Sequence, residues 1–276
     1  MQNKVTLIVP DIHHNWRTAE KIIAAVPHDE VLFLGDYFDD FGDNPQMVQE
    51  TCDWLTASVA KPNRIHLFGN HDIHYAFAYR YFQCSGYEQW KYFIAQDSVS
   101  RAVWDKLKWF HVLDNTWLVS HAGLHKFHLP DDIKQLSGDR TAFLHAIEEY
   151  LNLEVRKGFQ HGANNKSFWT YSAGHARGGM QRVGGILWCD FDREFFPIKG
   201  LNQILGHTPQ RYGIAKWCVL DEKESIAYRP VFEFNPPTGG LDDPSKSYNI
   251  DLDVHQDMHY GVWDGKKLIV KSHKDS

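Results

Sequence analysis

Val31-Leu32-Phe33-Leu34-Gly35-Asp36-Tyr37-Phe38-Asp39 is the segment around which the rest of the chain is arranged. Its four apolar residues, rich in strand formers, predict a short strand that is buried on both faces. Gly35 ends this run, and a glycine there allows the backbone to turn sharply and another group to approach closely. A carboxylate such as Asp36, just beyond a buried strand, is unfavourable unless it is paired or bound to a metal. We therefore expect Asp36 to hold two metal ions at once, and other strands to end in ligands as well.

A second strand of the same kind is predicted at residues 5–9. It leads into Asp11 and His13, which we expect to point the same way because alternate residues of a strand share a face. The apolar positions of residues 15–26 recur at helical spacing. This pattern predicts a helix that connects the first strand to the one at Val31.

A third strand is predicted at residues 64–68, after a helix over residues 45–59. It is followed by Gly69-Asn70-His71-Asp72. Strands that alternate with helices at this spacing indicate a parallel α/β unit, and such units bind ligands at the carboxyl ends of their strands. The aromatic residues 74–110 favour helices.

Two further strands lead into histidines. Residues 116–120 run into His121-Ala122-Gly123, and residues 201–205 run into Gly206-His207-Thr208-Pro209, with one helix between them at residues 141–156.

The last part of the chain predicts strands that complete a sheet rather than a separate domain. Residues 248–254 alternate like a strand, and residues 262–270 form a hairpin around Asp264-Gly265. We therefore expect one domain over residues 1–276, with helical or loop insertions around 74–115 and 125–200.

Composition excludes several classes of protein. The 276 residues are 43% hydrophobic, which is typical of a globular protein, and the formal charge of −6 argues against passive nucleic-acid coating. No apolar run approaches the length of a membrane span, and the N-terminus does not resemble a signal peptide. The four cysteines are scattered, without a Cys-x-x-Cys pair, which argues against a zinc ribbon and for reduced thiols in the cytoplasm.

Five predicted strands thus end in side chains suited to metal binding. In chain order these are Asp11 and His13, Asp36, Asn70 and His71, His121, and His207. A single histidine of this set is more often an ordinary surface or buried residue, but packing does not account for the whole set. Carboxylates, imidazoles and an amide suit manganese, iron or zinc rather than calcium. The set is large enough for two ions, which serve phosphate-ester chemistry by clamping the attacking and leaving oxygens.

These motifs resemble, in order and spacing, those of the calcineurin-like metallophosphoesterases. The resemblance spans the chain and implies an α/β fold, a metallophosphoesterase-type β-sandwich of two mixed sheets flanked by helices. It is closest to the phosphoprotein phosphatase branch, which includes diadenosine tetraphosphate hydrolases. His121-Ala122-Gly123 resembles the His-Gly-Gly of that branch, and Ile186-Leu187-Trp188-Cys189-Asp190 resembles its Leu-Trp-Ser-Asp.

The resemblance also implies roles for single residues. One metal would lie on Asp11, His13 and Asp36, and the second on Asp36, Asn70, His121 and His207. Pro209 stands where nuclease-like branches have a further histidine, which suits a phosphatase. In the family, a hydroxide that bridges the metals attacks phosphorus. His71 would then protonate the leaving oxygen, and Asp39 would orient His71.

The sequence departs from the family at the residue after Asp39. The branch has Asp-Arg-Gly there, whereas this chain has Asp39-Asp40-Phe41, so the arginine that grips the phosphate is replaced by an acid. Pro10 and His14 also replace family glycines. Arg177 and Arg193 are candidate replacements for the missing arginine, although arginines are mostly exposed for other reasons.

Three functions follow. The first is a two-metal phosphatase for phosphomonoesters of proteins or small molecules. The second is hydrolysis of nucleotide pyrophosphates or phosphodiesters. The third is an inactive metal-bound scaffold for protein interaction, against which the presence of both His71 and Asp39 argues.

Other conspicuous residues are expected to be structural. His125 and His128 are expected on a solvated loop, and Asp251 and Asp253 as polar strand ends. The aromatic runs at 168–171 and 188–196 are expected to pack in the core or a lid rather than to stack a base.

Overall fold

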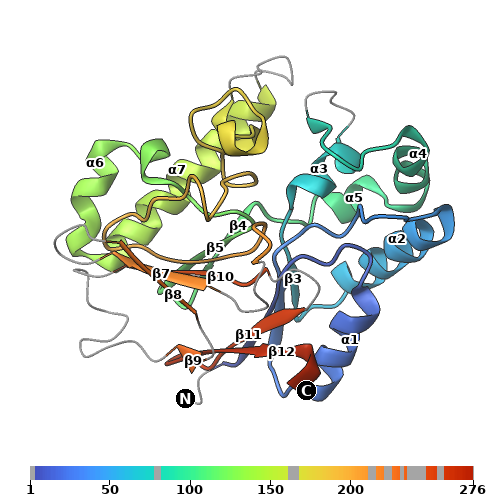
Figure 1. Cartoon of the computed structure of the whole chain (residues 1–276), viewed down its shortest axis with the longest axis horizontal. Helices are drawn as coiled ribbons and strands as arrows, with labels where there is room; N and C mark the ends of the chain where they lie inside the picture. The colour runs from blue at the N-terminus through green and yellow to red at the C-terminus, as the bar shows by residue number, and fades with distance from the viewer. Residues whose placement is uncertain are drawn as a thin grey trace.

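In the computed structural model, the described residues are 4–77, 82–160, 168–210, 216–220, 226–230, 233–234, 247–253 and 258–275. Within them, two mixed sheets of six strands lie face to face (Figure 1). The first sheet has the order β3 (Arg64–His66), β2 (Glu30–Phe33), β1 (Thr6–Val9), β11 (His259–Trp263), β12 (Leu268–Ser272) and β9 (Glu233–Phe234). The second has the order β4 (Phe110–Leu113), β5 (Trp117–Ser120), β6 (Asn202–Leu205), β10 (Ser247–Asp251), β7 (Lys216–Leu220) and β8 (Ile226–Pro230). The predicted sandwich is confirmed.

The parallel core of each sheet directs strand ends to one edge. β1, β2 and β3 are parallel, and so are β5, β6 and β10, whereas β11, β12, β4 and β7 pair antiparallel at the flanks. All four residues of β2 are buried, as the apolar run predicts. The predicted hairpin is formed by β11 and β12, with Gly265 at φ 83° in its turn.

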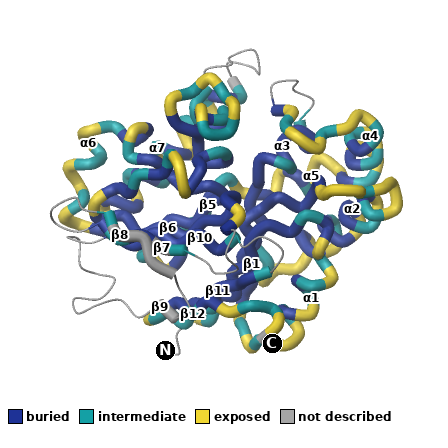
Figure 2. The backbone as a smooth tube through the Cα atoms, in the orientation of Figure 1, coloured by how far each residue is buried: buried dark blue, intermediate teal, exposed yellow. Residues whose placement is uncertain are grey.

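The interior of the sandwich is apolar. Side chains from β1 and β2 of one sheet contact side chains from β5, β6 and β10 of the other, and Trp117 meets Trp263 edge to face at 5.8 Å. Figure 2 shows β1, β5, β6 and β10 in the colour of buried residues.

Helices cover the outer faces. α1 (Trp16–Ala25), α2 (Pro45–Val59), α3 (Asn70–Ala76), α4 (Gln89–Ser98) and α5 (Arg101–Trp104) lie on the side of the first sheet, whereas α6 (Asp131–Lys134) and α7 (Arg140–Gln160) lie on the side of the second (Figure 1). α2 has the predicted bounds because Asn44 caps it, its Oδ1 accepting from Met47 N at 3.1 Å, and Pro45 follows at the first helical position.

Four strands were not predicted, namely β4, β7, β8 and β9. β4 begins at Phe110, the last residue of the aromatic stretch that favoured helices, and continues to Leu113. It pairs with β5 through a turn in which Asp114 and Asn115 both have positive φ. Its four residues, Phe110–Leu113, are too few to show alternation. The end of the predicted strand at 248–254 falls on residue 254, outside the described residues.

The described residues of the region around 125–200 contain α6, α7 and four short 3₁₀ helices: η2 (Lys126–His128), η3 (Gln135–Gly138), η4 (Trp169–Tyr171) and η5 (His175–Arg177). In the part of the chain that the structure describes, no helix is both long and apolar enough to cross a membrane.

Candidate metal centre

The predicted ligands meet where the loops after five parallel strands come together. The loop after β2 touches the loop after β3 so closely that a Cβ on Gly35 would lie 2.3 Å from the backbone N of Gly69. Gly35 also has φ 107°, which favours glycine. The structure therefore shows both features expected at Gly35, a sharp turn of the backbone and the close approach of another group.

A buried carboxylate holds the two loops together. Asp72 is fully buried and accepts hydrogen bonds from the backbone N–H groups of Asp36, Tyr37 and Gly69 at 2.7–2.8 Å. These bonds hold Asp36 at φ 50°, a left-handed conformation that is strained for a residue other than glycine. The sequence reasoning gave Asp72 no role, although it belongs to the quoted motif.

Asp11, His13 and Asp36 form the first cluster. Nε2 of His13 lies 4.0 Å from Oδ2 of Asp11 and 3.8 Å from Oδ2 of Asp36. Its Nδ1 lies 2.6 Å from the carbonyl O of Asp39, which accepts a hydrogen bond from Nδ1–H, and Nε2 faces the carboxylates. The prediction that Asp11 and His13 point the same way by strand alternation was wrong. β1 ends at Val9, before both residues, and His13 has φ 40°.

Asp36, His121 and His207 form the second cluster, together with Asn70. Nε2 of His121 lies 2.9 Å from Oδ1 of Asn70, 3.1 Å from Nδ1 of His207 and 3.3 Å from Oδ2 of Asp36. Nδ1 of His121 donates to the carbonyl O of Leu34 at 3.0 Å, so a neutral ring turns the lone pair of Nε2 toward Asp36 and Asn70. In this form the imidazole nitrogen, the amide oxygen and the carboxylate would offer their electron pairs to one cation.

The electrostatics of both clusters also favour positive charge. Burial lowers the pKa of His13 and of His121, but the carboxylates of Asp36 and Asp11 outweigh it and raise each pKa to about 9. Burial raises the pKa of Asp36, but the surrounding histidines, His121 foremost, hold it well below its usual value. Burial keeps the pKa of His207 well below its ordinary value, and its Nε2 is buried without a hydrogen-bond partner among the described residues. The donor set therefore fits metal ions.

His71 and Asp39 lie beside the clusters as a hydrogen-bonded pair. Nδ1 of His71 is 3.0 Å from Oδ2 of Asp39, and its ring meets that of His13 edge to face at 5.3 Å. Tyr75 Oη donates to Asp39 at 2.6 Å, and Nζ of Lys91 lies 3.0 Å away. Burial raises the pKa of Asp39, but hydrogen bonds, first from His71, hold it far below the usual range. Asp39 is therefore ionised and held in place.

A third group, Asp39, His74 and Cys84, has the spacing of metal ligands. Its Asp39 already receives hydrogen bonds from Tyr75 and Lys91, and burial raises the pKa of the Cys84 thiol above its ordinary value. A protonated thiol and a saturated carboxylate are poor ligands, so we assign this group to the support of His71.

The two arginine candidates lie in different places. Nε of Arg177 is 2.9 Å from Oδ2 of Asp190, and its Nη2 donates to the carbonyl O of His207 at 3.4 Å, at the rim of the second cluster. Arg193 is exposed and lines a separate cavity, and among the described residues no contact joins its side chain to the cluster. The acid that replaces the family arginine, Asp40, is exposed, and its carboxylate accepts from Phe41 N at 2.7 Å.

Two expectations about other residues were wrong. His125 and His128 do not lie on a solvated loop: both are 8% exposed, and His128 stacks on Trp169 at 4.3 Å. Asp251 and Asp253 are more than polar strand ends. Asp251 is fully buried, and Asp253 is close enough to Asp11 that burial and then the charge of Asp11 raise its pKa well above the ordinary value.

The aromatic runs mostly pack, as expected. Tyr171 and Phe168 join the main apolar core with Phe159, and Phe191 packs on Phe195 at 5.2 Å. Trp188 differs, because it is only partly buried and its ring meets that of His207 edge to face at 5.8 Å.

Comparisons with known proteins agree with this geometry. The model of the calcineurin-like phosphoesterase family matches residues 5–211, which include every residue of both clusters. No protein of curated function matches the chain in sequence.

Several solved structures are similar to the chain at low identity. A metallophosphoesterase from Sphaerobacter thermophilus is 13% identical, with 98% of this chain and 88% of that one covered and a TM-score of 0.46. A putative diadenosine tetraphosphatase is 13% identical, with 99% and 98% covered and a TM-score of 0.45. A serine/threonine phosphatase from Saccharomyces cerevisiae is 13% identical, with 99% and 80% covered and a TM-score of 0.46.

Proposed function

Since this chain belongs to the calcineurin-like phosphoesterase family and is a metal-dependent phosphoester hydrolase, we propose that its substrates are phosphomonoesters of proteins or small molecules. The observation that carries this choice is the position of Arg177. Its guanidinium reaches the carbonyl O of His207, while the exposed carboxylate of Asp40 bonds to its neighbouring amide. A dianionic monoester therefore meets a positive group at the rim of the centre.

We assign two metal ions to the clusters. Asp11, His13 and Asp36 would hold one, and Asp36, Asn70, His121 and His207 the other. Support comes from the convergence of the ligand atoms and from the carboxylates, which attract positive charge and raise the pKa values of His13 and His121 to about 9. The donor set suits manganese, iron or zinc. When bound, such ions polarise phosphoryl oxygens and make water more acidic.

We assign the general-acid role to His71. Asp39 is ionised and accepts from Nδ1 of His71, so Nε2 is the atom that would carry a proton to the leaving oxygen. The backbone N–H of His71 donates to Oδ1 of Asp36 at 2.8 Å, which ties the acid to the bridging ligand. Because both its backbone N–H and its Nδ1 are hydrogen-bonded, the imidazole of His71 keeps a fixed orientation.

We assign phosphate binding to Arg177. Asp190 pairs with the guanidinium at Nε and the carbonyl O of His207 accepts from Nη2, so Nη1 is the group that would bind an anion. Asp190 itself is held by the backbone, because its Oδ1 accepts from Arg193 N at 2.9 Å. The residue before Arg177 is fixed as well, since Ala176 N donates to Glu194 at 2.7 Å.

A second candidate function is hydrolysis of nucleotide pyrophosphates or phosphodiesters. Trp188 favours it, because its partly exposed ring beside His207 is able to stack on a base. An inactive scaffold is disfavoured, because the intact pair of His71 and Asp39 has no part in holding metal.

We further infer that the chain is one domain and acts in the cytoplasm. The two sheets share one apolar interior, which supports a single domain. Cys52, Cys84, Cys189 and Cys218 are all free thiols, which supports a reducing compartment.

The test compares Arg177→Gln with the control Arg17→Gln, an exposed arginine on α1 that pairs with Glu50. Manganese-loaded proteins are assayed on p-nitrophenyl phosphate, its bis-ester, a phosphopeptide and a dinucleoside polyphosphate. Arg177→Gln should raise KM for monoesters about 10- to 100-fold, because a hydrogen bond to a charged group contributes about 1.5–3 kcal/mol. Faster turnover of the bis-ester or the dinucleotide by the wild type would select the second function instead.

A further inference from the structure

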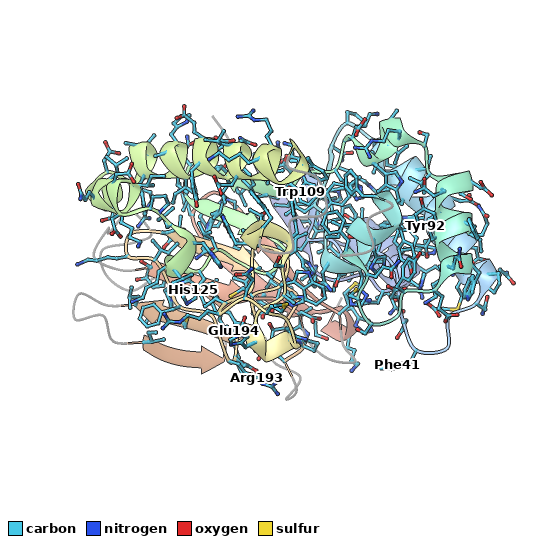
Figure 3. The ribbon with its side chains drawn as sticks, turned by 90° about the horizontal axis from the view of Figure 1, so that it is seen from above. Phe41, Tyr92, Trp109, His125, Arg193 and Glu194 are labelled. Atoms are coloured by element: carbon cyan, nitrogen blue, oxygen red, sulfur yellow. The ribbon has the colours of Figure 1, made fainter. Side chains whose placement is uncertain are left out.

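A cavity of about 790 Å³ lies apart from the metal centre. It lies between the segment after β5, the α6–η3 region and residues 193–199. None of the residues assigned to metal binding or to acid catalysis lines it. Figure 3 shows His125, Glu194 and Arg193 in the same part of the molecule, away from Phe41.

The rim of this cavity is basic although the chain as a whole is acidic. Its basic side chains are Lys126, Lys134, Arg182, Arg193 and Lys199, and its one acidic side chain is Glu194. Lys134 pairs with Asp131 at 2.8 Å. Among the described residues, no carboxylate pairs with Arg182, Arg193 or Lys199. Several cations without a carboxylate partner in the described part of the chain surround one cavity, and such a group of charges concentrates anions.

The carboxylate of Glu194 binds backbone amides rather than these basic side chains. Its Oε1 accepts from the backbone N of Ala176 at 2.7 Å, and its Oε2 accepts from that of Gly184 at 2.9 Å. The carboxylate is thus used to hold the surrounding backbone, and the basic side chains are left for a ligand.

The lining also offers aromatic surface. Phe127 is 56% exposed, which is unusual for so large an apolar side chain, and Cζ of Arg182 lies 5.5 Å from its ring centre. Nζ of Lys126 lies 3.5 Å from the ring centre of Phe196. Ile198 and Val183 complete an apolar floor. The cavity volume is within the range of small-molecule sites.

His125 lines the cavity as a neutral imidazole. Burial lowers its pKa to about 3, assisted by the neighbouring His128 and by the positive charges of Lys126 and Arg182. Its Nδ1 accepts from Phe127 N at 2.9 Å, so the proton of the neutral ring is on Nε2. The same basic groups that disfavour charge on His125 favour an anion near it.

We propose that this cavity binds a small organic anion that combines two or more phosphate groups with a flat ring, as a nucleoside di- or triphosphate does. Arg182, Arg193 and Lys199 bind the phosphates, and Phe127 packs on the ring. This site goes beyond the proposed phosphatase activity, and binding to it does not depend on which ester the metal centre hydrolyses.

The test measures binding of the β,γ-imido analogue of adenosine triphosphate to the manganese-loaded full chain by titration calorimetry. The variant Arg182→Glu/Lys199→Glu should weaken binding at least 10-fold. The control Lys21→Glu/Lys106→Glu changes the net charge equally at exposed positions outside the cavity and should leave the affinity within 2-fold. Turnover of p-nitrophenyl phosphate without nucleotide should be the same in all three proteins.

A second comparison separates the ring from the phosphates. Phe127→Ala should weaken binding of the nucleotide analogue several-fold and leave the affinity for inorganic tripolyphosphate unchanged. Equal affinities of wild type and Arg182→Glu/Lys199→Glu, with the analogue competing against p-nitrophenyl phosphate, would place it at the metal centre and overturn the proposal. Equal weakening by the control pair would also overturn it, since only overall charge would then matter. Tripolyphosphate binding as tightly as the nucleotide would overturn the role of the ring.

Discussion

Nζ of Lys91 lies 3.0 Å from Oδ1 of Asp39, with both side chains at most 3% exposed. The same ammonium group lies 2.6 Å from Oδ2 of Asp43 and donates to the carbonyl O of Gly86 at 2.7 Å. The family arginine at position 40 is absent, and Lys91, from α4, places a positive charge behind the carboxylate that supports His71. The charge thus stabilises Asp39, the partner of the histidine that we propose as the general acid.

Replacing Lys91 with methionine should destabilise the protein. Asp39 and Asp43 would remain buried without their cation, and breaking a buried ion pair by removing one partner costs about 3–5 kcal/mol. Urea unfolding measures the change in the free energy of unfolding. The matched control is Lys134→Met, which removes an exposed pair with Asp131 and should cost less than about 1 kcal/mol. Equal losses of unfolding free energy in the two variants would show that Lys91 does not stabilise the buried carboxylates.

The variant Asp36→Asn should lose both metal ions, because this residue belongs to both clusters. Elemental analysis of the purified protein, before and after manganese loading, gives the metal content. A chelator should abolish wild-type activity, and manganese should restore it. Asp53→Asn, an exposed residue of α2, is the control and should keep its metal. Full activity in a protein without metal would contradict the assigned centre.

The variant His71→Asn should keep its metal and lose the general acid. Turnover of an alkyl phosphate should fall by about 10²–10⁴, the usual contribution of such a group. p-Nitrophenyl phosphate should be affected less, because its leaving group scarcely needs a proton. His145→Asn, exposed on α7, is the control. Equal losses on the two esters would assign His71 another role.

The variant Asp40→Arg should leave KM for monoesters within about 2-fold, because the carboxylate at this position is exposed and bonds to Phe41 N. Steady-state kinetics on p-nitrophenyl phosphate checks this. A marked fall in KM would show that position 40 reaches the substrate.

Acid should destabilise the fold through His66. Burial and then Arg64 lower its pKa to about 3, and it lies neutral, stacked on Phe33 at 4.4 Å. The unfolded chain binds this proton near pH 6.5 and the folded one only near pH 3, so the contribution to stability is complete above pH 6.5 and falls as pH drops toward 3. The slope is at most about 1.4 kcal/mol per pH unit.

His66→Phe should therefore unfold with a shallower pH dependence between pH 6 and 4, by up to one proton. Urea unfolding at several pH values measures both slopes. His145→Phe serves as the control, since His145 is exposed and should leave the slope unchanged. Parallel curves for His66→Phe and wild type would contradict a neutral buried His66.

The sequence by itself determined the strands that lead into the predicted ligands, but not β4, β7, β8 or β9. β2 and α2 are specified by short-range patterns, namely an apolar run ended by glycine and a capped amphipathic repeat, and these are readable without knowing the fold. The same patterns place Asp11, Asp36, Asn70, His121 and His207 each just after a predicted strand. Parallel strands end at one edge, so their side chains had to meet.

Only the tertiary structure decided which side chains support these residues. Lys91 reaches Asp39 across 52 positions of sequence, Arg177 reaches His207 across 30, and Asp253 comes near Asp11 from the other sheet. No local pattern marks such contacts, because a lone lysine, arginine or aspartate has the same sequence context on a surface as in a core. What distinguishes them is burial beside an opposite charge, and burial is a property of the packed chain.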